Sequence, residues 1–332
     1  MGRRPPQRRA GVHRLRPQRR PDGAHRHPGL ITDEELAALE AEVQRALGSG
    51  DRSGLDLRGF GVTSVVLAAP LGAPTVACKR VPPFRDRATF ERYREVVLRN
   101  IDELRAAGVR VLDTEVRVVS HDGRLVGFVV QPLLPADTLG EAVLKASVPS
   151  AEHPLVVAMV DHVLTATTDR RGVDAQVGNW AVVDGDVVYV DVTTPFLVDD
   201  RGDLAMELDV FLQAGPPVMR PIYRRELPTS MKRWLDPRHA LLDLVGNLYK
   251  RDLDDWVQPI ITATAGKVDP PLTVEESRAY YDGEVKTWTM LHRVLKGYDW
   301  WQRRVRRTTP NGFLPPPDYD PVAWKAKQQA WA

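Results

Sequence analysis

Three residues in the middle of the chain have the types and spacing that could bind a magnesium ion. Asp174 and Asn179 are five residues apart, and Asp191 follows a short hairpin and ends an otherwise apolar segment. Carboxylate and amide oxygens are the hard donors that Mg²⁺ prefers, and Mg²⁺ takes few protein ligands, which leaves room for phosphate groups. An unpaired buried carboxylate is costly, so Asp191 needs a partner or an ion. The pattern indicates a metal site that faces phosphates, although an Asp-x-x-x-x-Asn turn by itself is common in loops.

A second group of residues, earlier in the chain, could contact phosphate groups. Gly59 and Gly61, followed by Ser64, make a glycine-rich turn at the start of a predicted hairpin. Without a Cβ atom, the backbone N–H groups of such a turn can approach phosphate oxygens closely. Lys79 ends the next apolar strand, where its ammonium group would pair with phosphates. A tight turn at the entry to a strand has the same composition, so this signal is weak by itself.

A lysine in that position needs a carboxylate to hold it. Glu95, in the helix predicted to follow, is the carboxylate that we expect to pair with Lys79, and Glu91 is the alternative one turn earlier. Exposed glutamates are also ordinary features of a helix surface, so both interpretations stay open at this point.

Missing motifs exclude several other kinds of site. The chain contains no Gly-x-x-x-x-Gly-Lys-Ser/Thr loop, no His-Glu-x-x-His and no Gly-x-Ser-x-Gly, the signatures of P-loop proteins, zinc hydrolases and serine hydrolases. The single cysteine, Cys78, excludes an intramolecular disulfide and a cysteine-based zinc cluster, and it is typical of a reducing compartment. We therefore expect a cytoplasmic protein. No apolar run approaches the ~18 residues that a membrane-spanning helix needs, so no membrane association is expected.

The net charge of +2 conceals an uneven distribution. Residues 1–28 hold nine arginines and one aspartate, so the remaining 304 residues sum to −6. The proline-rich, lysine-free composition of this tail predicts disorder. An arginine cluster could neutralise nucleic-acid phosphates, but the tail has no interleaved aromatic residues and the rest of the chain is acidic. Nucleic acid is therefore not the partner that we expect.

The elements that position these residues change in character along the chain. Thr32 and Glu35 form a capping box before an amphipathic helix that ends at Gly48. Strands are predicted at residues 63–69, 74–81, 109–119 and 125–131, with a helix at 86–107 between the two pairs. Helices are predicted at 153–168, 238–256 and 283–306, with a hairpin at 180–183 and 186–190. The pattern predicts an α+β fold, in which one helix packs on a small antiparallel sheet.

The order of these elements carries a family resemblance. A glycine-rich hairpin, a strand lysine, a helix glutamate, an Asp-x-x-x-x-Asn loop and a later aspartate together resemble the protein-kinase-like superfamily. Gly178-Asn179-Trp180-Ala181-Val182, followed by Tyr189-Val190-Asp191, is similar to the aminoglycoside phosphotransferase and choline-kinase branch, which phosphorylates small molecules. The resemblance covers about residues 57–212 and rests on order and spacing together.

The resemblance implies a two-lobed protein that uses ATP and Mg²⁺. Residues 29–132 would form a β-rich nucleotide-binding lobe with the N-terminal helix, and residues 133–332 a larger, mainly helical lobe with the catalytic loop and the substrate side. The nucleotide would be contacted by Gly59, Gly61, Ser64, Lys79, Gln131 and Leu133. The catalytic residues would be Asp174, Lys79 and Glu95, and the metal ligands Asn179 and Asp191.

Several positions depart from the family pattern. Gly172 stands where a histidine is usual, Gln176 where a lysine or histidine is usual, and Val192-Thr193 where Phe-Gly is usual. Ser64 replaces the third glycine of the turn. The base and metal residues remain, which favours an active but divergent phosphotransferase acting on a hydroxyl or amine of a small molecule. The departures also fit a pseudokinase that binds a nucleotide or a protein partner without chemistry.

Acidic residues beyond the metal aspartate suggest a substrate class. They are Asp199, Asp200, Asp203, Glu207 and Asp209. A cationic small molecule would be attracted to them if they faced the substrate, whereas a solvated surface would have the same composition.

Overall fold

The computed structural model describes residues 29–61, 64–212, 215–314, 326–327 and 329, and the arginine-rich segment 1–28 lies outside the described residues. The strands are β1 (Leu57–Phe60), β2 (Val65–Ala69), β3 (Val76–Arg80), β4 (Arg110–Val111), β5 (Glu115–His121), β6 (Arg124–Pro132), β7 (Arg171–Gly172), β8 (Trp180–Val183), β9 (Asp186–Tyr189) and β10 (Phe196–Leu197). The helices are α1 (Asp33–Ser49), α2 (Arg87–Ala106), α3 (Gly140–Lys145), α4 (Pro154–Ala166), α5 (Asp209–Leu212), α6 (Arg220–Met231), α7 (Pro237–Leu248), α8 (Val257–Thr264) and α9 (Val274–Trp301). The fold is α+β, as the sequence predicted.

A five-stranded antiparallel sheet, in the order β1-β2-β3-β6-β5, occupies one side of the molecule. The expected hairpin is β2–β3, in which Val66 pairs with Lys79, and β3 continues the sheet through pairing of Lys79 with Val129. The single strand expected at 109–119 is divided in two. Its first part, β4, leaves the sheet and pairs in parallel with β9, because Leu112-Asp113-Thr114 breaks the strand before β5 begins.

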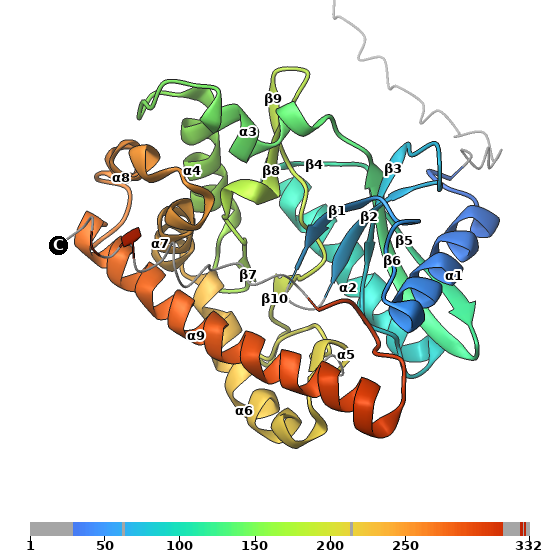
Figure 1. The fold of residues 1–332 in the computed structure, drawn as a ribbon. Coiled ribbons are helices and arrows are strands. Elements are labelled where there is room, and N and C mark those ends of the chain that lie inside the picture. The colour runs from blue at the N-terminus through green and yellow to red at the C-terminus, as the bar shows by residue number, and fades with distance from the viewer. Residues whose placement is uncertain (1–28, 62–63, 213–214, 315–325, 328, 330–332) are drawn as a thin grey trace, which may run out of the picture.

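Helices cover both faces of this sheet, whereas the sequence predicted one packed helix. α1 packs on the face that carries Cys78 and Phe128. α2 belongs to the core on the opposite face, with Val129 and the helices beyond residue 140. Figure 1 shows α1 on the outer side of the sheet and α2 between the sheet and the rest of the molecule. Because side chains alternate along a strand, Lys79 points away from the α1 side that buries Cys78.

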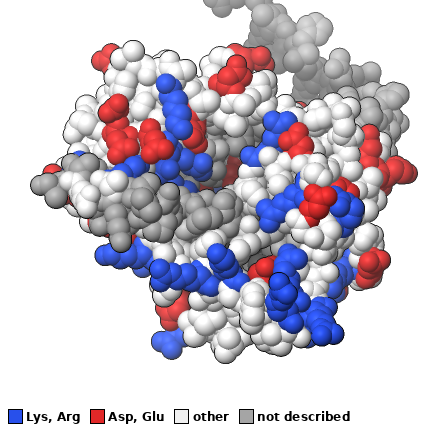
Figure 2. All heavy atoms as spheres, in the orientation of Figure 1, with Lys and Arg blue, Asp and Glu red and all other residues white. Residues whose placement is uncertain are grey.

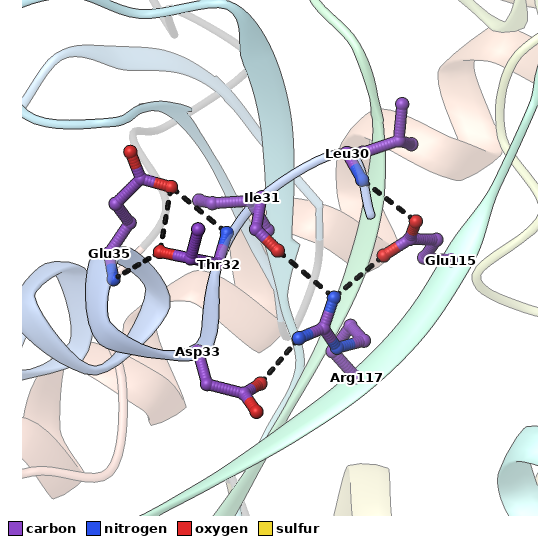
Figure 3. A network of polar contacts seen from close by, with 7 residues as sticks. All are labelled: Leu30, Ile31, Thr32, Asp33, Glu35, Glu115 and Arg117. Carbon is purple, nitrogen blue, oxygen red and sulfur yellow. Dashed lines mark hydrogen bonds and ion pairs between the residues drawn. The ribbon is translucent and has the colours of Figure 1, made fainter. Parts of the chain in front are cut away.

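The entry to α1 is tied to the sheet edge by a polar network (Figure 3). The predicted capping box is present, since Thr32 Oγ1 accepts from the Glu35 N–H and the Glu35 carboxylate accepts from the Thr32 N–H at 2.9 Å. On β5, Arg117 pairs with both Asp33 and the Glu115 carboxylate. These contacts orient the first turn of α1 on β5, and they fix which helix face covers the sheet.

A fully buried ion pair joins the middle of α1 to β3. Arg80 Nε and Nη2 donate to the two carboxylate oxygens of Glu40 at 2.7 and 2.8 Å, and both side chains are at most 2% exposed. The remaining guanidinium nitrogen, Nη1, donates to the backbone carbonyl oxygen of Asn311 at 2.8 Å. The pair therefore connects α1, the strand of Lys79 and the segment that follows α9.

The remainder of the chain is a helical part built around α4 and α7. Every residue of α7 from Ala240 to Leu248 is buried, and α4, α8 and α9 pack around it. The expected hairpin at 180–190 is present as β8–β9. α9 begins at Val274, earlier than predicted, because Thr273 caps it by accepting from the Glu276 N–H. Within the part of the chain that the structure describes, no helix has the length and apolar character that a membrane span requires.

α9 crosses the molecule, and residues 302–314, which follow it, return to α1 and the sheet (Figure 1). Just beyond α9, Arg303 Nη1 donates to the Leu47 carbonyl at 2.8 Å. Phe313 packs against the α1–sheet core, and the Arg52 guanidinium lies 4.6 Å from the centre of its ring. Figure 2 shows Lys and Arg side chains gathered along the course of α9 on this face. The helix thus extends from the α7 core toward α1 and the sheet.

Candidate functional site

An ion pair between two predicted site residues joins the sheet to the β8–β9 hairpin. Lys79 Nζ, on β3, lies 2.6 Å from Asp191 Oδ2, two residues beyond β9, and the two side chains are 18% and 25% exposed. The other oxygen, Asp191 Oδ1, accepts from the Thr193 N–H at 3.1 Å. Burial by itself would raise the pKa of Asp191, but Lys79 and the Thr193 donors outweigh burial and hold this pKa below its ordinary value. Asp191 is therefore ionised and shared between a cation and a backbone donor.

The loop that carries Asp174 runs from β7 into the 3-10 turn Val177–Asn179 and is held by its own side chains. Asp174 Oδ1 accepts from the Gln176 N–H at 3.2 Å. The Asp174 carbonyl oxygen accepts from Asn179 Nδ2 at 3.2 Å and from the Tyr189 hydroxyl at 3.3 Å. The loop backbone is thereby fixed to β9, close to where Asp191 emerges.

The Asp174 carboxyl has an unusual affinity for protons. Burial and the nearby Asp191 carboxylate raise its pKa to about 6, against the opposing effects of the Gln176 N–H, the Asn179 amide and the Lys79 cation. A carboxylate with a pKa near the working pH is well suited to accept and release a proton.

Trp180 is the packing residue that sets the shape of this loop. It is fully buried, its Nε1 donates to the Ala175 carbonyl at 3.1 Å, and its ring contacts that of Tyr189 at a centroid distance of 4.9 Å. The buried indole group therefore fixes the backbone of the loop at Ala175 to the β8–β9 hairpin.

The oxygen atoms of this site match the donors that Mg²⁺ prefers. Asn179 uses Nδ2 in its hydrogen bond to the loop, which leaves Oδ1 as the atom available to a cation. Asp191 adds a carboxylate on the neighbouring strand end. Among the described residues no group of three or more His, Cys, Asp or Glu side chains forms a metal cluster. One carboxylate and one amide suit an ion that takes most of its ligands from water and phosphates.

The carboxylate that holds Lys79 differs from the one expected from the sequence. Glu95 is exposed on α2, and the partner of Lys79 is Asp191. The buried face of α2 contains Phe90, Tyr93 and Val97, and a residue two positions after Tyr93 points to the opposite side of a 3.6-residue helix. Glu91, the alternative, pairs with arginines of its own helix.

The glycine-rich turn lies at the end of the sheet's first strand. Gly59 is in β1 opposite Val66, and Gly61 donates its N–H to the Ser64 carbonyl at 2.9 Å. A Cβ atom at Gly61 would lie 2.5 Å from Ser64 Oγ, so a side chain there would require the serine hydroxyl to move. Residues 62 and 63 lie outside the described residues, so the structure defines the two ends of this turn.

At the end of β6, the Gln131 side chain and the Leu133 N–H both form hydrogen bonds within the protein. Gln131 Nε2 donates to Thr114 Oγ1 at 3.0 Å, and the Leu133 N–H donates to the Thr75 carbonyl at 3.0 Å. The Leu133 N–H is thus engaged beside the β3–β6 pairing and is not free to contact a nucleotide. The Leu133 carbonyl would have to serve instead.

Asp243 is a further acidic residue of this region that the sequence did not reveal. It is 2% exposed on α7, and its Oδ1 accepts from the Tyr280 hydroxyl of α9 at 2.6 Å. Its Oδ2 has no hydrogen-bond partner within the part of the chain that the structure describes. Burial and the Asp174 carboxylate raise the pKa of Asp243 to about 7, against the Tyr280 hydrogen bond. A lone aspartate in the apolar run Leu241-Leu242-Asp243-Leu244-Val245 was the available signal.

The absence of a histidine at position 172 has a steric explanation. In β7, a Cβ atom on Gly172 would lie 2.3 Å from the carbonyl oxygen of Trp234 and 3.0 Å from Phe196 Cβ. The backbone of Trp234 therefore occupies the place that a side chain at position 172 would need.

The acidic residues expected to attract a cationic substrate are mostly engaged. Asp200 pairs with Arg170 at 2.6 Å, Glu207 with Arg92 at 2.5 Å, and Asp209 with Arg224 at 2.8 Å. Asp199 accepts backbone N–H groups of its own turn. These ion pairs neutralise much of the charge of residues 199–209, so this segment gives little support to the expected cationic attraction.

One comparison with known proteins places the chain in a family. Residues 38–298 match the model of a family described as "Family of unknown function (DUF6206)". None of the curated proteins that were compared matches the chain. The match begins within α1 and ends within α9, so it includes both the sheet and the helical part.

Proposed function

The chain belongs to DUF6206, a family of unknown function, and from the geometry of its site we propose that it is an ATP- and Mg²⁺-dependent phosphotransferase. Its acceptor would be a hydroxyl or an amine of a small molecule. In this proposal the fold is a divergent protein-kinase-like one, with residues 29–132 as the nucleotide-binding lobe and residues 133–332 as the helical lobe.

The observation that carries the proposal is the Lys79–Asp191 ion pair. Its 2.6 Å contact joins residues 112 positions apart, one from the sheet and one from the end of a hairpin. Asp174 lies near enough to Asp191 and Lys79 for both to affect its pKa. A lysine, a candidate base and two candidate metal ligands, chosen from sequence order alone, therefore belong to one region of the molecule.

Each residue would have a separate task. Lys79 would neutralise phosphate oxygens, and Asn179 and Asp191 would hold Mg²⁺, which supplies positive charge to the transferring phosphoryl group. Asp174 would orient the acceptor and take its proton, while the acceptor oxygen or nitrogen bonds to the γ-phosphorus and the bond to the β,γ-bridging oxygen breaks to release ADP. The raised pKa of Asp174 supports its part in this proton transfer.

The acceptor would lie on the α7–α9 side of Asp174. The unpartnered Oδ2 of Asp243 and the hydroxyl of Tyr280 are polar groups on that side, next to an ionisable loop residue. A buried carboxylate without a cation supports an acceptor with a positively charged or hydrogen-bond-donating group.

A second candidate is a pseudokinase that binds a nucleotide without phosphoryl transfer. Three observations favour it: Glu95 does not hold Lys79, the Leu133 N–H is engaged in the sheet, and Gly172 admits no side chain. Either candidate requires nucleotide binding, and they differ in turnover.

The test is ADP release by the full chain with Mg²⁺-ATP and a panel of hydroxyl- and amine-bearing small molecules, alongside thermal shifts with Mg²⁺-ATP. We expect Asp174→Ala to lower turnover by about 10²–10⁴-fold, the usual contribution of a general base. Asp191→Ala should remove both turnover and the Mg²⁺-dependent stabilisation by ATP. Asp186→Ala is the matched control, because Asp186 is an exposed carboxylate that pairs with Arg110 at the far end of β9.

The outcomes separate the candidates. Turnover that depends on Asp174 and Asp191 supports the phosphotransferase. Mg²⁺-dependent ATP binding without turnover supports the pseudokinase. If Asp174→Ala and Asp191→Ala turn ATP over as fast as the parent, or if ATP never stabilises the protein, the proposal is wrong.

A further inference from the structure

A small cavity of about 220 Å³ opens between the loop before α2 and the helices α5 and α6, away from the site described above. It is lined by Arg85, Asp209, Leu212, Arg220 and Arg224. Its charged lining residues are three arginines and one aspartate, which gives a net charge of +2. Arg85 comes from the sheet side of the molecule, and Arg220 and Arg224 come from the helical part.

Two of the three guanidinium groups are held in place by carboxylates. Arg224 donates Nε and Nη2 to the two oxygens of Asp209 at 2.8 and 2.9 Å. Arg85 donates Nε to Asp86 at 2.8 Å, and Asp86 also caps α2 by accepting from the Thr89 N–H. Each arginine thus keeps other N–H donors for a ligand while its position is restrained.

The three arginines act together on the one carboxylate that lines the cavity. The hydrogen bond from Arg224 lowers the pKa of Asp209, against a smaller opposing effect of burial, and the charges of Arg85 and Arg220 lower it further. All three cations therefore lie close enough to act on the same carboxylate.

Arg220 supplies the observation that points to a ligand. Its Nε is buried and has no hydrogen-bond partner among the described residues. A buried charged donor without an acceptor loses its hydration without compensation. Arg220 is also the first residue of the 12-residue helix α6.

We propose that this cavity binds the phosphate group of a small phosphomonoester, with Arg220 and Arg85 as donors and Arg224 positioned by Asp209. The planar fork of arginine matches phosphate oxygens in bidentate geometry. A phosphomonoester carries about −1.5 to −2 charges at pH 7, a charge opposite in sign to that of the three arginines that line the cavity. The volume is below the roughly 300–1,000 Å³ of pockets for drug-sized ligands, so one oxyanion group fits better than a whole nucleotide.

The site bridges two parts of the molecule that also meet beside it. Arg92 of α2 pairs with Glu207 at 2.5 Å, and the Tyr93 hydroxyl donates to the Thr193 carbonyl at 2.9 Å. An anion held by Arg85 and Arg220 adds a third connection between α2 and the segment that follows Asp191. Binding therefore stabilises this junction, independently of the proposed phosphotransfer.

The experiment titrates the full chain with inorganic phosphate and with phenyl phosphate, with chloride at equal ionic strength as the reference. Isothermal titration and thermal shift at pH 7.5 are the readouts. We expect saturable binding and a higher Tm in the parent, and binding at least tenfold weaker in Arg220→Gln and in Arg85→Gln. Arg225→Gln is the matched control, since Arg225 lies on the same helix, is 87% exposed and pairs only with the neighbouring Glu226 among the described residues.

Lys79→Ala distinguishes this cavity from the candidate site, and we expect it to bind both probes like the parent. Circular dichroism establishes that each variant is folded. If Arg220→Gln does not fold, Arg85→Gln decides, because the Arg85 side chain is 67% exposed and lies in a loop. The proposal is overturned by no response beyond that to chloride, by equal losses in Arg225→Gln, or by binding that disappears with Lys79→Ala and persists in Arg220→Gln.

Discussion

The lack of space at Gly172 predicts a large loss of stability when a single methyl group is added. In Gly172→Ala the new Cβ would lie 2.3 Å from the Trp234 carbonyl oxygen and 2.6 Å from its carbonyl carbon, whereas real Cβ atoms essentially never come within 3.0 Å of a neighbour. The obstacle is backbone, so it cannot rotate away as the end of a side chain could. The Trp234 ring also stacks on Phe196 at 5.2 Å, so the two nearest neighbours of the methyl group support each other.

The magnitude follows from the cost of overpacking a filled interior, typically 1–3 kcal/mol. We expect a decrease of about 2 kcal/mol in the free energy of unfolding, which lowers the ratio of folded to unfolded protein about 30-fold. Urea unfolding followed by circular dichroism and tryptophan fluorescence measures it, with the same denaturant dependence in parent and variant.

Gly283→Ala is the matched control for this substitution. Gly283 lies in the middle of α9 with no atom within 4 Å of an added Cβ. Alanine there removes the conformational penalty of a helical glycine and should stabilise the protein by about 0.5–1 kcal/mol. If Gly172→Ala unfolds within 0.5 kcal/mol of the parent, or if both variants shift in the same direction, the steric explanation of Gly172 is refuted.

Three further predictions concern buried groups. Glu40→Gln should destabilise the protein by about 3–5 kcal/mol in urea unfolding, because it leaves the Arg80 charge buried without its partner; a loss below about 1 kcal/mol would contradict this. The pKa of Asp243, raised to about 7 from 3.8, means that its contribution to stability is present at low pH and is lost as pH rises through about 7. Asp243→Asn, which keeps an acceptor for Tyr280, should therefore flatten the dependence of unfolding free energy on pH between about 4 and 7, and an unchanged profile would show that the carboxyl is not the cause. Burial raises the pKa of the Cys78 thiol to about 12, so a thiol reagent at pH 8 should react with it only after unfolding, and rapid reaction of the native protein would exclude this burial.

Local sequence signals were enough to predict those helices and hairpins whose boundaries are set by neighbouring residues. The capping box of Thr32 and Glu35 fixed the start of α1, and the Asp184-Gly185 turn fixed the β8–β9 hairpin. Lys79 and Asp191 were both expected in the candidate site from the family resemblance, but the carboxylate expected to pair with Lys79 was Glu95. These predictions depend on spacing over a few residues or on the order of elements.

Features that depend on how distant elements pack together could not be predicted from local sequence patterns. The angular position of Glu95 on α2 depends on which side of that helix faces the core, and Phe90, Tyr93 and Val97 decide it. Asp243 becomes part of the site only because α7 packs against the Asp174 loop. The cavity of Arg85 and Arg220 joins segments more than a hundred residues apart, which no local pattern could indicate.

The contact between Arg80 and Asn311 has a consequence for how the protein is made. The two residues are 231 positions apart, and Asn311 accepts from the guanidinium group that α1 buries. At a synthesis rate of about 5–20 residues per second, roughly 10–50 s pass between the emergence of Arg80 and that of its last partner. During that interval the sheet and α1 can form, but the surface that receives Phe313 stays uncovered. The buried Arg80–Glu40 pair therefore lacks its third hydrogen bond until most of the chain has been synthesised.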